Sequence, residues 1–140
     1  MSQQSAEFKI KKKNLAKALA AIKKLAKKTK QMSGGTWQSG KKTEACFSWV
    51  STKEFVKAKT LPDALVAWRW SGFINDAGDL VEINFDGEKL GDDPILLEAI
   101  APFVEAGSYI EMEGEEGCHW KWCFDGKTMT GKQGRVVYED

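Results

Sequence analysis

Histidine, cysteine and long apolar runs are scarce in this sequence, and each shortage argues against a class of protein. The chain has one histidine and three cysteines, and no Cys-x₂-Cys pair offers the spacing of a structural zinc site. No apolar run approaches the roughly 20 residues of a membrane-spanning helix. We therefore expect no metal, no cofactor and no membrane partner. The odd number of cysteines, without a secretion signal, favours the reducing cytoplasm.

Catalytic motifs are scarce as well. Any histidine-dependent dyad must use His119, and its predicted strand neighbour Cys118 points to the opposite face. Residues 126–128 read Gly-Lys-Thr but lack the earlier glycine of a phosphate-binding P-loop, so a turn is the better interpretation. Cys46 or Cys123 could still meet His119 in space. A small enzyme using these residues therefore stays open as an alternative to the expected non-enzymatic role.

What the sequence does contain is the composition of a single globular domain. Hydrophobic residues make up 42% and charged residues 29% of 140 positions, which is ordinary for one domain with one core. We expect residues 1–140 to form one α+β domain. Its predicted architecture is a mostly antiparallel sheet of five to six strands, with three to four helices packed on one face.

Hydrophobic periodicity and capping residues predict the order of the elements. Alternation near residues 7–11 predicts a first strand, and an apolar stripe from Leu15 to Leu25 predicts a helix over 15–28. A Gly- and Ser-rich stretch near 31–43 predicts a flexible loop. The remaining predicted elements are a strand at 46–50, capped helices starting near Ser51 and Thr60, a hairpin turn at 75–79, a strand at 80–85, a helix opened by Asp92, and meander strands near 108–113, 118–124 and 135–138.

Charge is distributed unevenly along the chain. Residues 1–42 contain 12 lysines and one acid, whereas residues 43–140 contain 9 basic and 19 acidic residues. Lysines flank the apolar stripe of the first predicted helix, either as an ordinary solvated face or as contacts for nucleic-acid phosphates. No arginine accompanies them, so only non-specific, salt-sensitive binding is expected there. The lysines concerned are Lys17, Lys23, Lys24, Lys27 and Lys28.

An acidic counterpart lies on a predicted strand and turn late in the chain. Alternation places three of its side chains on one strand face, and two glutamates follow in the adjoining turn. Such a row could meet basic groups on a partner, or it could be a solvated face that pairs internally with the lysines. Its members are Tyr109, Glu111, Glu113, Glu115 and Glu116.

The six tryptophans divide into expected core residues and expected anchors. Trp120 and Trp122 share one strand face, which favours the core. Trp70 lies off the apolar stripe of its predicted helix, and Trp37 lies in the predicted loop. Exposed aromatic side chains are frequent hot spots of protein interfaces. We therefore expect Trp37 and Trp70 to be exposed anchors for a partner.

Three segments carry a resemblance to known proteins. Residues 101–111, 114–117 and 120–126 resemble small accessory proteins of phages and integrative elements of Gram-positive bacteria. The resemblance implies inhibition of host defence, as anti-CRISPR proteins perform it. The favoured hypothesis is thus a non-enzymatic inhibitor or adaptor that binds a protein or ribonucleoprotein partner. The lysine-rich helix does not fit a purely acidic mimic, so nucleic-acid binding is kept as an alternative.

Overall fold

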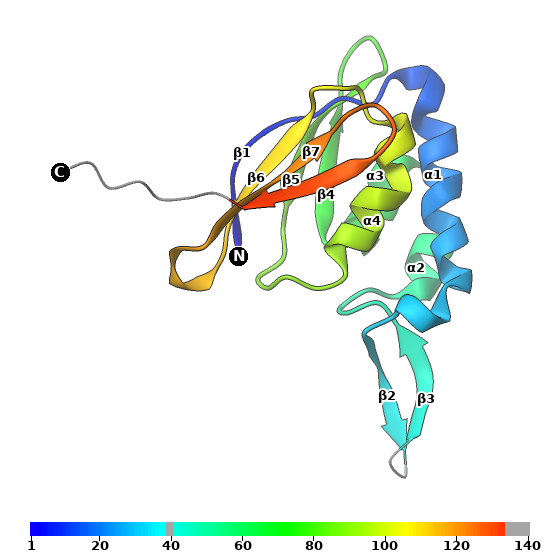
Figure 1. Ribbon diagram of the computed structural model, residues 1–140. Coiled ribbons are helices and arrows are strands. Elements are labelled where there is room, and N and C mark those ends of the chain that lie inside the picture. The colour runs from blue at the N-terminus through cyan, green and yellow to red at the C-terminus, as the bar shows by residue number, and fades with distance from the viewer. Residues whose placement is uncertain (39–40, 134–140) are drawn as a thin grey trace, which may run out of the picture.

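The structure is a computed structural model that describes residues 1–38 and 41–133 and has an α+β architecture (Figure 1). The side chains of residues 36–38 and 41–44 are outside that description. The strands are β1 (Ser2–Glu7), β2 (Gly34–Gln38), β3 (Lys41–Cys46), β4 (Trp70–Ile74), β5 (Leu80–Phe85), β6 (Tyr109–Glu113), β7 (His119–Phe124) and β8 (Met129–Gln133). Four antiparallel strands form the main sheet, in the order β1-β6-β7-β8, and β2-β3 and β4-β5 are separate pairs.

Helices connect these strands and cover one side of the main sheet (Figure 1). The α-helices are α1 (Leu15–Lys24), α2 (Thr52–Lys57), α3 (Leu61–Ala67) and α4 (Asp93–Ile100). Short 3-10 turns span Lys12–Asn14, Leu25–Lys27, Thr29–Gln31, Ala101–Phe103 and Glu115–Gly117. No helix in the described part of the chain has both the length and the apolar character needed to cross a bilayer.

The α+β class and the mostly antiparallel pairing are confirmed, but the expected sheet of five to six strands is divided. The described residues give a four-stranded sheet and two separate pairs. A side chain joins β1 to β5, which belong to different sheets. The Gln3 amide donates to the carbonyl of Ile83 at 2.8 Å and accepts from the N–H of Phe85 at 3.0 Å. It thus bonds β5 as a neighbouring strand would.

Local capping signals predict the two central helices correctly. Ser51 precedes α2 and its side chain accepts from the N–H of Glu54, while Thr60 precedes α3 and accepts from the N–H of Asp63. Each cap satisfies one of the N–H groups that a helix start leaves without an intrahelical partner. The prolines near the starts of α3 and α4 also occupy tolerated first-turn positions.

The apolar stripe of α1 is buried as predicted. Ala18, Ile22 and Leu25 are at most 3% exposed, and α1 packs against α3 and α4. The predicted helix over 15–28 ends its last turn as the 3-10 segment Leu25–Lys27. Because one face is occupied by packing, the lysines of α1 are placed on the remaining faces.

Strand alternation in β6 and β7 is also confirmed. Ile110, Met112, Trp122 and Phe124 are at most 4% exposed and belong to the core, and Trp120 packs partly buried against it. Side chains at the intervening positions therefore face outward from the main sheet. This places the predicted acidic row on the sheet surface away from the helices.

The predicted exposure of Trp70 is wrong. Its side chain is 0% exposed, and its indole N–H donates to Asp93 at 2.9 Å. Trp70 begins β4 and does not continue α3, because Arg69 has a left-handed φ of 70° and redirects the chain. Because Trp70 lies outside the helix, its position relative to the apolar stripe of that helix does not determine its exposure.

The stretch near 31–43, which was predicted to be a flexible loop, forms strands over most of its length, and its flexibility stays a prediction. Strands β2 and β3 form an antiparallel hairpin that projects beyond the end of α1 (Figure 1). The two strands of the hairpin contact chiefly each other. Neither strand therefore needs an apolar face, and the sequence shows no alternating apolar pattern that could have predicted them. Residues 39–40 of the predicted loop lie outside the described residues. The side chain of Trp37 also lies outside them, so the expectation that it is exposed is untested.

Two strand boundaries also differ from expectation. The first strand ends at Glu7, and Ile10 makes only an isolated bridge to Leu80. The predicted strand at 46–50 is a turn after β3, in which Phe47 is buried and Trp49 is exposed. The left-handed φ of 59° at Trp49 breaks the alternation that was expected to place both side chains on one face. The last predicted strand, at 135–138, lies outside the described residues.

Candidate functional site

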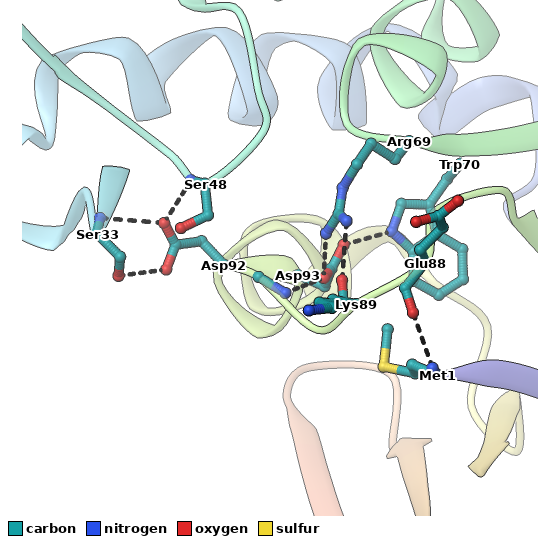
Figure 2. A network of polar contacts seen from close by, with 10 residues as sticks. Met1, Ser33, Ser48, Arg69, Trp70, Glu88, Lys89, Asp92 and Asp93 are labelled. Atoms are coloured by element: carbon teal, nitrogen blue, oxygen red, sulfur yellow. Dashed lines mark hydrogen bonds and ion pairs between the residues drawn. The ribbon is translucent and has the colours of Figure 1, made fainter. Parts of the chain in front are cut away.

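Two adjacent carboxylates at the start of α4 connect distant segments of the chain (Figure 2). Asp93 is 1% exposed and accepts three hydrogen bonds. They come from Arg69 Nη2 at 2.8 Å, Trp70 Nε1 at 2.9 Å and the Gly91 N–H at 2.9 Å. Bonds from a guanidinium to a carboxylate are among the strongest in proteins. Asp93 therefore fixes the position of Arg69.

Asp92 holds a second set of segments. Its Oδ1 accepts from Ser33 Oγ at 2.6 Å, and its Oδ2 accepts from the N–H groups of Ser33 at 3.1 Å and Ser48 at 2.9 Å. Asp92 occupies the N-cap position of α4, as expected, but its side chain does not cap the helix. It connects the segment after α1 to the turn that carries Trp49 (Figure 2).

Trp49 and Arg69 form a contacting pair with unusual backbone geometry. Both are non-glycine residues in the left-handed region, with φ of 59° and 70°. The Arg69 guanidinium lies 4.8 Å from the centroid of the Trp49 ring and 5.2 Å from that of Phe85. Such cation–π contacts orient both partners. Strained residues that touch each other are typical of positions held for a function.

Two glycines make room for this arrangement. A Cβ at Gly87 would lie 2.8 Å from Arg69 Nη1, and one at Gly91 would lie 2.9 Å from Arg69 Nη2 and 3.1 Å from Trp49 Cε3. A side chain at either position would force the guanidinium to shift. Arg69 Nη1 also donates to the carbonyl of Lys89 at 2.8 Å. The segment 87–91 is thus fitted closely around the guanidinium.

A pocket of about 400 Å³ opens beside this pair. Its lining consists of Trp49, Arg69, Gly87, Glu88 and Lys89. Trp49 contributes an exposed aromatic surface, since 60% of the residue is accessible. Of its charged lining residues, Arg69 is paired with Asp93, and the other two, Glu88 and Lys89, carry opposite charges.

Six lysines of α1 and the segment after it form what we call the lysine surface. Five of them are exposed and Lys23 is half-buried. No ion pair within the described residues involves any of the six. Their charges are therefore not neutralised by direct contacts in that part of the chain. The lysine surface consists of Lys17, Lys23, Lys24, Lys27, Lys28 and Lys30.

The predicted acidic row is brought together in part. Tyr109, Glu111 and Glu113 lie on the outer face of β6, opposite Cys123, Lys121 and His119 of β7. Lys121 Nζ lies 4.5 Å from the centroid of the Tyr109 ring, His119 Nε2 lies 3.8 Å from Glu113 Oε1, and Ser5 Oγ donates to Glu111 at 2.9 Å. Basic groups therefore interleave with this part of the row. The remaining members, Glu115 and Glu116, are exposed in the following turn.

The lysine surface and the acidic row lie on opposite sides of the molecule. Figure 1 places α1 on the far side of α3 and α4 from β6 and β7, the central strands of the main sheet. The amino-terminal lysine segment does meet an acid before α1, where Lys9 Nζ lies 3.9 Å from Asp79 Oδ2. The two charge groups are otherwise separated, so the molecule has a basic side and a mixed, partly acidic side.

Cys123 cannot form the expected alternative dyad with His119. They share one face of β7 but are four residues apart, which corresponds to about 13 Å along a strand. Cys46 ends β3 in the projecting hairpin, away from β7 in Figure 1. No group of three or more His, Cys, Asp or Glu side chains that could hold a metal occurs in the described parts of the chain.

The Gly-Lys-Thr segment at 126–128 is a turn, as expected. The Asp125 carboxylate accepts from the N–H groups of Lys127 at 2.9 Å and Thr128 at 2.7 Å, and from the Thr128 hydroxyl at 3.0 Å. The bond from the Thr128 backbone, followed by that from Lys127, holds the pKa of Asp125 below its usual value. An internal carboxylate thus occupies these two N–H groups, which a phosphate would need in a P-loop.

The Trp49 pocket was missed by the sequence interpretation. Strand alternation predicted that Trp49 and Phe47 share a face, and it gave no reason to connect Trp49 with Arg69. The available signals were weak: glycines at 87 and 91 and an arginine in the apolar segment Trp68–Trp70. The pairing depends on Asp92 and Asp93, whose partners other than Gly91 are 23 to 59 residues away.

Comparisons with known proteins leave the function to be argued from geometry. No family model, curated protein or solved structure matches the chain. The resemblance to small mobile-element proteins therefore stays a prediction. The lysine surface, the acidic row and the Trp49 pocket are the features from which a function can be inferred.

Proposed function

We propose that this protein is a non-enzymatic module that binds nucleic acid through the lysine surface. The observation that supports this most directly is that no member of that surface takes part in an ion pair within the described residues. Unpaired, solvated ammonium groups can neutralise phosphates and release the counterions condensed around them. Lysine presents a point charge without fixed geometry, so the binding is non-specific in sequence.

The dimensions of the lysine surface suit a phosphate backbone. Lys28 is eleven positions after Lys17, and the rises of the α-helix and of the 3-10 segment that follows it give roughly 18 Å for that span. One strand of a duplex carries about five phosphates over that length. The mixed sheet on the opposite side would repel a polyanion or attract it only weakly. Charge separation of this kind orients the molecule as it approaches its ligand.

The decisive experiment measures affinity for a labelled oligonucleotide of about 12 residues by fluorescence anisotropy at several salt concentrations. The plot of log K against log salt has a negative slope. Lys17→Gln/Lys24→Gln is expected to make that slope shallower by about one to two units, since each lost phosphate contact removes nearly one unit. Lys127→Gln/Lys132→Gln is the matched control, because it removes the same charge from exposed positions by the main sheet. Equal effects of the two double variants, or salt-independent binding, would refute the proposal.

A second candidate is the protein-binding inhibitor or adaptor favoured by the sequence. It is supported by Glu115 and Glu116, which are exposed and take part in no ion pair among the described residues. The basic residues Lys121 and His119 lie beside Glu111 and Glu113, which weakens the case for an acidic docking surface there. Its test is the capture of a protein partner that survives nuclease treatment and that a Glu115→Gln/Glu116→Gln variant no longer retains.

A further inference from the structure

Trp49 is held in an exposed position with a strained backbone conformation. An aromatic residue with a φ of 59° is strained, because its Cβ crowds the following carbonyl. The Ser48 N–H bond to Asp92 and the Arg69 guanidinium nevertheless hold it there. The guanidinium covers one face of the ring, and with 60% of the residue accessible we take the other face to be open to solvent.

The pocket beside Trp49 is suited to a planar, uncharged group. Its volume of about 400 Å³ lies at the small end of the range for ligand sites. Its charged lining consists of Glu88, Lys89 and an Arg69 that is already paired with Asp93, so little net charge is left to attract a phosphate at this point. Stacking on the indole ring is the interaction that the pocket offers most clearly. A nucleobase has the required planar face.

Asp92 links the segment that precedes Trp49 to the segment that follows one end of the lysine surface. Ser33 and Ser48 bind the same carboxylate of Asp92 (Figure 2), and Ser48 immediately precedes Trp49. Lys30 is three residues before Ser33, which limits their Cα separation to about 11 Å even for a fully extended chain. A strand whose phosphates contact the lysines at this end could therefore place a neighbouring base beside Trp49.

We propose that the Trp49 pocket takes one unpaired base of a single-stranded nucleic acid whose phosphates contact the lysine surface. The inference rests on the proposed function and adds the ligand class. In a duplex both faces of an internal base are covered by its neighbours, so a base must be unstacked and unpaired before it can reach the ring, a cost that a single strand largely avoids. Stacking is tolerant of sequence because every base has such a face. The protein therefore prefers single strands without preferring a sequence.

The test compares three oligonucleotides of about 12 residues at one low salt concentration: a base-bearing single strand, an abasic strand with the same phosphates, and a duplex. The native protein is expected to bind the base-bearing strand roughly tenfold more tightly than the abasic strand, as loss of one stacked base predicts. Trp49→Ala should remove that difference and leave abasic binding unchanged. Trp49→Phe, which keeps an aromatic ring, should retain part of it.

Phe73→Ala is the matched control, since Phe73 is also an aromatic residue, 55% exposed, but lies on β4 outside the pocket. It should leave the preference for bases intact, and thermal unfolding should verify that each variant folds. Equal binding of base-bearing and abasic strands would overturn this inference. If the lysine variants still weakened that binding, the proposed function would stand. An unchanged preference in Trp49→Ala would also overturn the inference. Failure of every oligonucleotide to bind would refute both.

Discussion

At the scale of single residues, Asp93 controls the geometry of the Trp49 pocket. It accepts from Arg69, Trp70 and Gly91 while 1% exposed. Its charge is compensated by a guanidinium that is itself only 16% exposed. Removal of one member of such a pair leaves the other desolvated and unpaired. The same carboxylate thus supports stability and the position of the ring-stacking arginine.

Asp93→Ala is expected to lower the free energy of unfolding by about 3 to 5 kcal/mol, the usual cost of breaking a buried ion pair. Urea denaturation followed by circular dichroism measures the change. Asp76→Ala is the control, because Asp76 is exposed in the β4–β5 turn, and it should change stability by about 0.5 kcal/mol or less. A similar loss in both variants would contradict the role assigned to Asp93.

At the scale of secondary structure elements, the junction between the main sheet and the β4-β5 pair depends on Gln3. Its amide bonds to both Ile83 and Phe85 of β5. An amide can donate and accept at once, as a peptide group does. A single side chain therefore supplies two of the bonds that a continuous sheet would make through its backbone.

Gln3→Ala should lower the free energy of unfolding by about 1 to 3 kcal/mol, because the Phe85 N–H and the Ile83 carbonyl lose their partner. Hydrogen exchange at the Phe85 amide should also accelerate. The neighbouring Gln4→Ala is the control, since the Gln4 side chain is exposed and bonds only to Ser2 among the described residues. Unchanged protection of Phe85 in the Gln3 variant would show that the junction does not depend on this amide.

Elements fixed by local interactions were predictable from the sequence, whereas those fixed by distant partners were not. The starts of α2 and α3 follow from Ser51 and Thr60, whose caps act three residues away. The stripe of α1 follows from helical periodicity, and so does the position of most of its lysines on the solvated faces. The burial of Trp70 depends on Asp93 and on the reversal at Arg69. The Trp49 pocket depends on the same distant contacts, so only the lysine part of the candidate site could be foreseen.

At the scale of the whole molecule, the uneven charge of the sequence becomes a division between two sides. The lysine surface lies on α1 and the segment after it, and the acids of β6 share the opposite surface with Lys121 and His119 (Figure 1). The formal net charge of +1 conceals this division. A polyanion approaching such a molecule meets a favourable potential on one side only. Binding should therefore be confined to that side.

The most direct test of this account is an amide chemical-shift titration of the isotope-labelled protein with a base-bearing single strand of about 12 nucleotides. The account predicts that the largest shifts occur in residues 15–31, at Trp49 and in segment 87–91, and that they diminish as salt is added. Shifts concentrated in β6 and β7, or no shifts at low salt, would contradict it.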